Sequence, residues 1–106
     1  LDERFNLIFS SMALHHIENI SRLLGVFFNL LEPGGIIALA DLDQEDGSFH
    51  DSDFTGHKGF QRNNLEEITK QSGFGNVIFK DIYTFIRPNS LGQKEFPVFL
   101  MIAKKN

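Results

Sequence analysis

The sequence contains no cysteine, no tryptophan and a single tyrosine among its 106 residues. Without cysteine the chain cannot form a disulfide bond, a thiolate metal site or a cysteine nucleophile. Its apolar runs, such as Ile36 to Ala40, are far shorter than the ~20 apolar residues that a membrane-spanning helix needs. The sequence therefore predicts no membrane span.

Positive charge is also scarce, because 10 lysines and arginines face 14 aspartates and glutamates, for a net charge of −4. Nucleic-acid backbones bind basic surfaces, so we expect no nucleic-acid partner. The composition is otherwise that of a globular domain, with 42% hydrophobic residues and 12 phenylalanines. A chain of this length buries only roughly two-thirds of its unfolded surface, which predicts one core of marginal stability.

Two segments have the apolar periodicity or the end signals of helices. In residues 19–31 apolar side chains recur at three- and four-residue spacing, and a Pro-Gly-Gly turn ends that pattern. Asn63 and Glu66 have the spacing of a capping box, which predicts a second helix over 63–72 that stops at Gly73.

Four apolar segments are predicted to be strands. Residues 5–9 form a short buried strand, and the continuous apolar run 36–40 is typical of a strand covered on both faces. Residues 77–86 and 96–103, joined by the turn-rich loop 87–95, predict an antiparallel hairpin. The order is β-α-β-loop-α-β-β, which predicts an α/β fold in which an antiparallel strand joins a parallel sheet.

A long acidic loop follows the second predicted strand, with six acids between residues 41 and 53. Loops of this length in compact domains are usually functional or mobile. The spacing of its acidic residues does not match the calcium loop of an EF-hand. Asp46 stands where that loop requires glycine, and Ser52 stands where it requires a bidentate glutamate. We favour a solvated lid and assign no metal, although four residues of the loop have metal-ligating side chains: His50, Asp51, Asp53 and His57.

Two motifs give the chain a resemblance to a known family. The first is the segment 5–17, FNLIFSSMALHHI, and the second is the segment 30–41, LLEPGGIIALAD. Their order and separation resemble those of class I S-adenosylmethionine-dependent methyltransferases, especially the small-molecule branch that includes ubiquinone- and menaquinone-biosynthesis-type enzymes. The resemblance covers essentially the whole chain.

The resemblance implies that residues 1–106 are one partial domain, the C-terminal half of a Rossmann-like methyltransferase sheet flanked by helices. Its strands would be numbers 4, 5, 6 and 7 of a seven-stranded sheet ordered 3-2-1-4-5-7-6, with strand 7 antiparallel. The family's Gly-x-Gly-x-Gly turn and the acidic residue that holds the ribose hydroxyls have no counterpart in this sequence. We therefore expect this chain alone neither to bind the cofactor tightly nor to catalyse transfer.

The resemblance places Ser10, Ser11 and Met12 beside the methionine portion of the cofactor, S-adenosyl-L-methionine. A structural alternative stays open, in which the serines end a strand and Met12 packs under a helix. His15 and His16 are adjacent, so they point in different directions and cannot chelate one metal as an i, i+4 pair does. One of them is a candidate general base, and the other a capping or packing residue.

The resemblance places Asp41, His57 and Phe60 on the side of the substrate. Phe60 has a favoured alternative as an ordinary core residue. The implied reaction is direct attack of a small-molecule nucleophile on the sulfonium methyl, in a cytoplasmic enzyme.

A second hypothesis is a non-enzymatic binding or assembly module that retains half of the fold. In both hypotheses the strand Phe5–Phe9 is an uncovered apolar edge. We predict that this edge either self-associates or is completed by a missing N-terminal segment.

Overall fold

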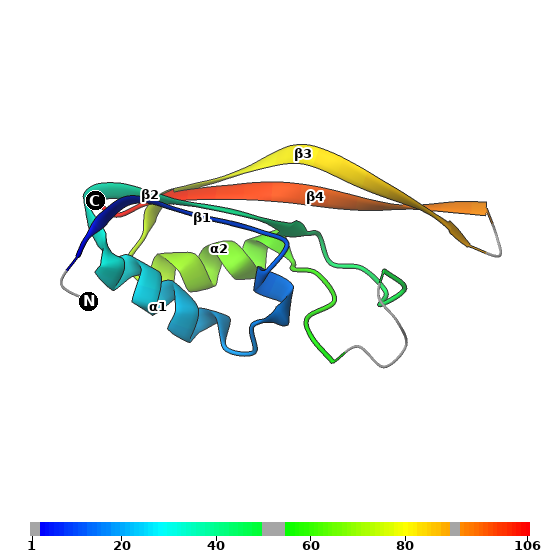
Figure 1. Ribbon diagram of the computed structural model, residues 1–106, viewed down its shortest axis with the longest axis horizontal. Coiled ribbons are helices and arrows are strands. Elements are labelled where there is room, and N and C mark those ends of the chain that lie inside the picture. Colours follow the sequence, from blue (N-terminus) through cyan, green and yellow to red (C-terminus); the bar gives the residue numbers. More distant parts are fainter. Residues whose placement is uncertain (1–2, 50–54, 90–91) are drawn as a thin grey trace.

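Four strands form one mixed sheet, and the helices all lie on one side of it (Figure 1). The structure, a computed structural model, describes residues 3–49, 55–89 and 92–106. The elements, in chain order, are β1 (Phe5–Ser11), the 3-10 helix η1 (Leu14–His16), α1 (Ile20–Leu30), β2 (Leu31–Leu42), α2 (Arg62–Gln71), β3 (Gly75–Asn89) and β4 (Gly92–Lys104).

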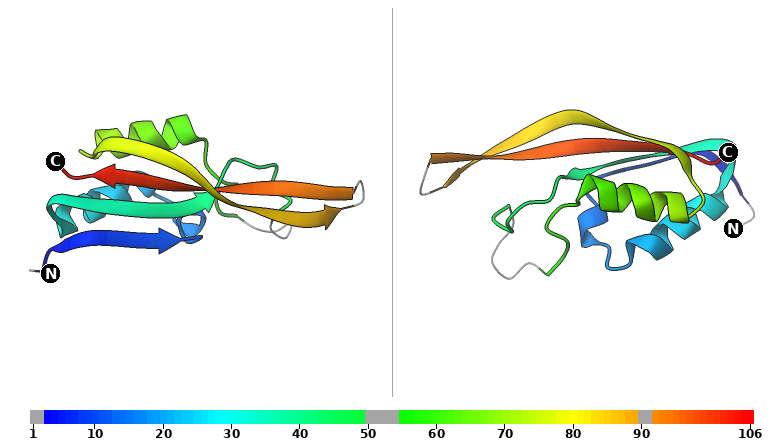
Figure 2. Two further views of the ribbon diagram at one scale, coloured as in Figure 1. Left: turned by 90° about the horizontal axis from the view of Figure 1, so that it is seen from above. Right: turned by 180° about the vertical axis from the view of Figure 1, so that it is seen from behind.

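The strand order is β1-β2-β4-β3, so the last strand of the chain lies between the second and the third (Figure 2). β1 and β2 are parallel, and β4 is antiparallel to both of its neighbours, β2 and β3. This mixed α/β sheet confirms the predicted fold class. Because parallel strands β1 and β2 end at the same edge, the loops that follow them lie together, where ligands bind in open α/β sheets.

The core is divided between the two faces of the sheet because successive strand residues point to opposite sides. Ile37 and Leu39 of β2 are fully buried in a first cluster that also contains Leu24 of α1 and Leu65 of α2. The intervening positions of β2 and β4 contribute to a second cluster of Ala40, Leu42, Phe96 and Val98, against which Met12, Phe49, Phe85 and Leu100 pack.

The face opposite the helices is only partly covered. Phe9, Ala38, Ile102 and Ile78 stand in register across all four strands, and Phe9 is 65% exposed. Ile36 and Ala38 are only half-buried, so the prediction that residues 36–40 are covered on both faces is wrong. The reason is that α1 and α2 pack on the same side of the sheet (Figure 1).

Both predicted helices are present, but the second begins earlier than predicted. Asn19 caps α1 as its side chain accepts a hydrogen bond from the Arg22 amide, at 3.0 Å. The N-cap of α2 is Gln61, which makes no side-chain cap hydrogen bond, so the capping role of Asn63 is wrong. Gly73 has a φ of +110° and follows the end of the helix as predicted.

The hairpin of β3 and β4 extends beyond the other two strands as a two-stranded arm. β2 pairs with β4 only from Lys104 to Val98, whereas β3 remains paired with β4 as far as Asn89 and Gly92. The prediction of a loop over residues 87–95 is therefore wrong, because most of these residues belong to the paired strands. The arm makes the molecule elongated, 50 × 26 × 21 Å (Figure 2). In the described part of the chain, the helices lack the length and the apolar composition of a membrane-spanning segment.

Candidate functional site

The predicted cofactor residues Ser10, Ser11 and Met12 lie at the carboxyl end of β1. Ser11 is exposed, whereas Ser10 and Met12 are half-buried. Met12 has a φ of +58°, a left-handed conformation that non-glycine residues rarely adopt, and its amide donates to the Ala40 carbonyl at 2.8 Å. Its side chain packs on the second cluster, not under a helix. Left-handed non-glycine residues are concentrated at functional sites.

A buried carboxylate joins the end of β2 to the turn that follows β1. Asp41 is fully buried, and its Oδ2 accepts a hydrogen bond from the His15 amide at 2.9 Å. Its Oδ1 accepts from the His15 ring Nδ1 and from the Leu42 amide, both at 2.7 Å. The carboxylate thus fixes both the backbone and the ring orientation of His15.

The two adjacent histidines have different surroundings. His15 is buried and His16 is exposed, although their ring centroids are 4.2 Å apart. Within the described residues, no group of three or more His, Asp or Glu residues could hold a metal ion. The alternative metal ligands His50, Asp51 and Asp53 lie outside the described residues.

His57 and Phe60 return the loop after β2 to the end of that strand. The His57 amide donates to the His15 carbonyl, and its ring Nε2 donates to the Ile17 carbonyl, both at 2.8 Å. The Phe60 amide donates to the Leu42 carbonyl at 2.9 Å, and the Phe60 side chain belongs to the first core cluster. The structure thus brings His15, Asp41, His57 and Phe60 together, with Phe60 in the core position favoured above.

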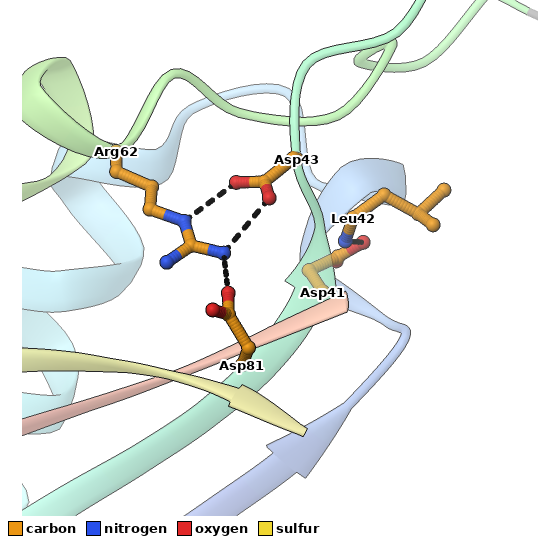
Figure 3. A network of polar contacts seen from close by, with 5 residues as sticks. All are labelled: Asp41, Leu42, Asp43, Arg62 and Asp81. Atoms are coloured by element: carbon orange, nitrogen blue, oxygen red, sulfur yellow. Dashed lines mark hydrogen bonds and ion pairs between the residues drawn. The ribbon is translucent and has the colours of Figure 1, made fainter. Parts of the chain in front are cut away.

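Arg62, which belongs to none of the sequence motifs above, connects the loop after β2 to β3 (Figure 3). Its guanidinium donates to both oxygens of Asp43, at 2.7 and 2.8 Å, and to Asp81 at 2.5 Å. The Asp43 carboxylate, with a smaller contribution from Asp81, raises the pKa of Arg62 above its ordinary value. No sequence signal identifies the contact, because each partner is 19 residues away from Arg62.

We expect Arg62→Lys to lower the free energy of unfolding by about 1 kcal/mol, because lysine cannot make the bidentate pair with Asp43. Urea denaturation measures this effect. Asp81→Asn is the matched control, since the Asp81 side chain is 83% exposed and its pair should contribute little. An equal loss in the two variants would show that the bidentate geometry does not matter.

The first part of the loop after β2 is attached to the arm. The ring of Phe49 packs against Phe85 and Phe96, with the Arg87 guanidinium 4.3 Å from its centroid. Lys94 of the arm pairs with Asp46, and hydrogen bonds from Lys94 and then Ser48 hold the pKa of Asp46 below its ordinary value. The loop is therefore held by the arm as well as by Arg62.

A groove opens beside these residues on the helix side of the sheet. Its volume is about 690 Å³, and it is lined by Glu18, Asn19, Ile20, Ser21, His57, Phe60 and Ile68. The groove lies between the start of α1, the segment 57–60 and α2. Two of the predicted substrate residues, His57 and Phe60, therefore line one groove, whereas the buried Asp41 does not.

The mixed sheet, with its polar turns at the carboxyl ends of β1 and β2, defines an α/β protein of the Rossmann-like class. The sequence profile of the methyltransferase domain family matches residues 1–78, and the chain belongs to that family. The match includes both motifs of the sequence analysis and the residues Ser10 to Phe60 of the candidate site.

Solved structures of S-adenosylmethionine-dependent methyltransferases have the same fold. A Bacillus halodurans protein that its name assigns to the methyltransferases is 17% identical with a TM-score of 0.71, over 98% of this chain and 65% of that one. A methyltransferase from Thermotoga maritima is 16% identical with a TM-score of 0.70, over 99% and 57%. Phosphoethanolamine N-methyltransferase 2 from Haemonchus contortus, in complex with S-adenosyl-L-methionine, is 15% identical with a TM-score of 0.69, over 95% and 33%.

The chain thus spans between 33% and 65% of the lengths of these three structures. This partial coverage fits the prediction of a C-terminal half of the methyltransferase fold. No curated protein matches the sequence.

Proposed function

We propose that the chain is the C-terminal part of an enzyme that transfers a methyl group from S-adenosyl-L-methionine to a small-molecule acceptor, in the branch related to quinone biosynthesis and in the cytoplasm. The main support is the position of Ser10, Ser11 and Met12, at the carboxyl end of β1 and within the family match. Ligands of open α/β sheets bind at this edge.

The residues at the end of β1 fit one side of a cofactor site. The hydroxyl groups of Ser10 and Ser11 offer hydrogen bonds, and the left-handed backbone at Met12 turns the chain sharply at this point. When bound, the cofactor supplies an electrophilic methyl group. The sequence has no Gly-x-Gly-x-Gly turn to complete the site, so in our proposal the isolated chain binds the cofactor weakly and is inactive.

On the acceptor side, His57 and Phe60 bind the acceptor and exclude water, and Asp41 orients His15 through the hydrogen bonds described above. His15 or the exposed His16 accepts a proton from the acceptor nucleophile. An imidazole suits this role because its pKa ordinarily lies near neutral pH.

Titration of the chain with S-adenosylhomocysteine, followed by amide NMR shifts, tests the proposal. We expect weak binding, with a dissociation constant above the micromolar range. The largest amide shifts should occur at Ser10, Ser11 and Met12. Ser11→Val should weaken this binding, and Ser48→Val should leave it unchanged. The absence of shifts at these residues would contradict the cofactor role, whereas sub-micromolar binding would contradict the need for a glycine-rich turn.

A non-enzymatic assembly module is the second candidate, and the exposure of β1 favours it. β1 is an edge strand that pairs only with β2 among the described strands, and Leu7 and Phe9 are 55% and 65% exposed. Exposed apolar edge strands promote pairing with another chain. We propose that this edge self-associates or is covered by a missing N-terminal segment.

We expect the chain to self-associate and Phe9→Lys to shift it toward monomer, because a lysine on an edge strand opposes strand addition. Sedimentation equilibrium over a range of concentrations measures the shift. Val26→Lys is the matched control, since Val26 is an exposed apolar residue that belongs to α1 and not to the edge strand. A native chain that is monomeric at every concentration would contradict the expectation.

A further inference from the structure

The groove beside the start of α1 has polar residues at its rim and apolar residues at its base. Ile20 and Phe60 are buried, and Ile68 is half-buried. Glu18, Asn19 and Ser21 are exposed. The volume of about 690 Å³ lies within the range of small-molecule sites, roughly 300–1,000 Å³. The groove therefore has the volume, the apolar base and the polar rim to bind one small organic molecule.

The charge of the groove is negative. None of the lining residues is a lysine or an arginine. Among the described residues, the Glu18 carboxylate makes no ion pair within 4.0 Å. A carboxylate at the rim of a groove without a competing cation favours a positively charged ligand.

The aromatic residues of the groove form a fixed part of its wall. The rings of His57 and Phe60 are 5.1 Å apart, and His57 is held in place by the hydrogen bond from its Nε2 to the Ile17 carbonyl. Because a carbonyl only accepts, Nε2 of His57 carries a proton.

We propose that this groove binds a small organic ammonium ion, with its cationic group at Glu18 and its apolar part on Ile20, Phe60 and Ile68. As a binding site it is independent of methyl transfer. If the proposed function is correct, the same site makes the methyl acceptor an amine or an alkylated amine.

The start of α1 favours a ligand of the opposite charge, because the positive end of a helix dipole attracts anions. Asn19 already caps this end, and Glu18 precedes it. A comparison of ligands of opposite charge therefore distinguishes an ammonium site from an anion site, and a neutral ligand of the same shape measures the apolar contribution alone.

Benzylammonium, benzyl alcohol and benzoate, each titrated into the full chain, are the probes, and amide NMR shifts are the readout. We expect benzylammonium to bind most tightly, with shifts confined to residues 18–21 and 57–60 and to Ile68. Glu18→Gln should weaken its binding about fivefold, the upper range for an exposed ion pair. Glu32→Gln, which removes an exposed carboxylate at the other end of α1, should not.

Three results would each overturn the proposal: benzoate or benzyl alcohol binding as tightly as benzylammonium, unchanged binding in Glu18→Gln, and shifts outside the groove. Failure of the proposed function has a separate signature, the absence of S-adenosylhomocysteine shifts at Ser10 to Met12, which leaves the ammonium result intact.

Discussion

Replacing Asp41 with alanine is expected to lower the free energy of unfolding by about 3–5 kcal/mol, because each buried donor left without an acceptor costs about 1–3 kcal/mol. The substitution removes the acceptor of two hydrogen bonds from His15 and one from the Leu42 amide. All three donors would be left buried, and each buried donor without an acceptor is costly. Urea denaturation at one protein concentration measures the loss.

Asp46→Ala is the matched control for Asp41→Ala. Asp46 is also a hydrogen-bonded aspartate in the region after β2, but it is exposed, so its replacement should have a much smaller effect. Similar losses in the two variants would show that burial of Asp41 adds nothing. We also expect the His57 amide to exchange faster in Asp41→Ala than in the native chain, because His57 donates to the carbonyl of His15, which Asp41 holds.

The prediction of the fold succeeds where the signal is local. The α1 helix follows from the three- and four-residue spacing of its apolar side chains. The antiparallel hairpin is predicted, but its extension into residues 87–95 is not, because Pro88, Asn89 and Gly92 are typical of a loop. In the structure the arm is stabilised from outside its own sequence, by Phe49 and by the Lys94 pair with Asp46.

In the site too, local sequence signals predict single residues, but they do not predict contacts between residues far apart in the chain. His15 and Asp41 could be selected because each stands at the end of a strand motif, but their contact joins residues 26 positions apart. The start of α2 lies next to the end of β2, where Phe60 bridges to Asp43 and Arg62, the first residue of the helix, pairs with Asp43. A local capping pattern at Asn63 carries no information about either contact.

Gly59 lies where the segment that carries His57 and Phe60 crosses the end of β2. It has a φ of +73°, and a Cβ at this position would lie 2.1 Å from the Asp43 carbonyl oxygen. We expect Gly59→Ala to lower the free energy of unfolding by about 3 kcal/mol or more, since both the left-handed backbone and the backbone overlap oppose it. It should also displace Phe60 from its bridge to Asp43 and weaken benzylammonium binding.

Gly34→Ala separates the two causes. Gly34 also has a positive φ, +88°, but a Cβ there would meet nothing within 4 Å. Its replacement should therefore lower the free energy of unfolding by about 1–2 kcal/mol, through the strain of the left-handed backbone alone. It should leave the groove unchanged. Equal losses in the two variants, measured by urea denaturation, would mean that the 57–60 segment moves aside without cost. That result would contradict its role as a fixed wall of the groove, because a wall that yields to one methyl group does not hold His57 and Phe60 in place.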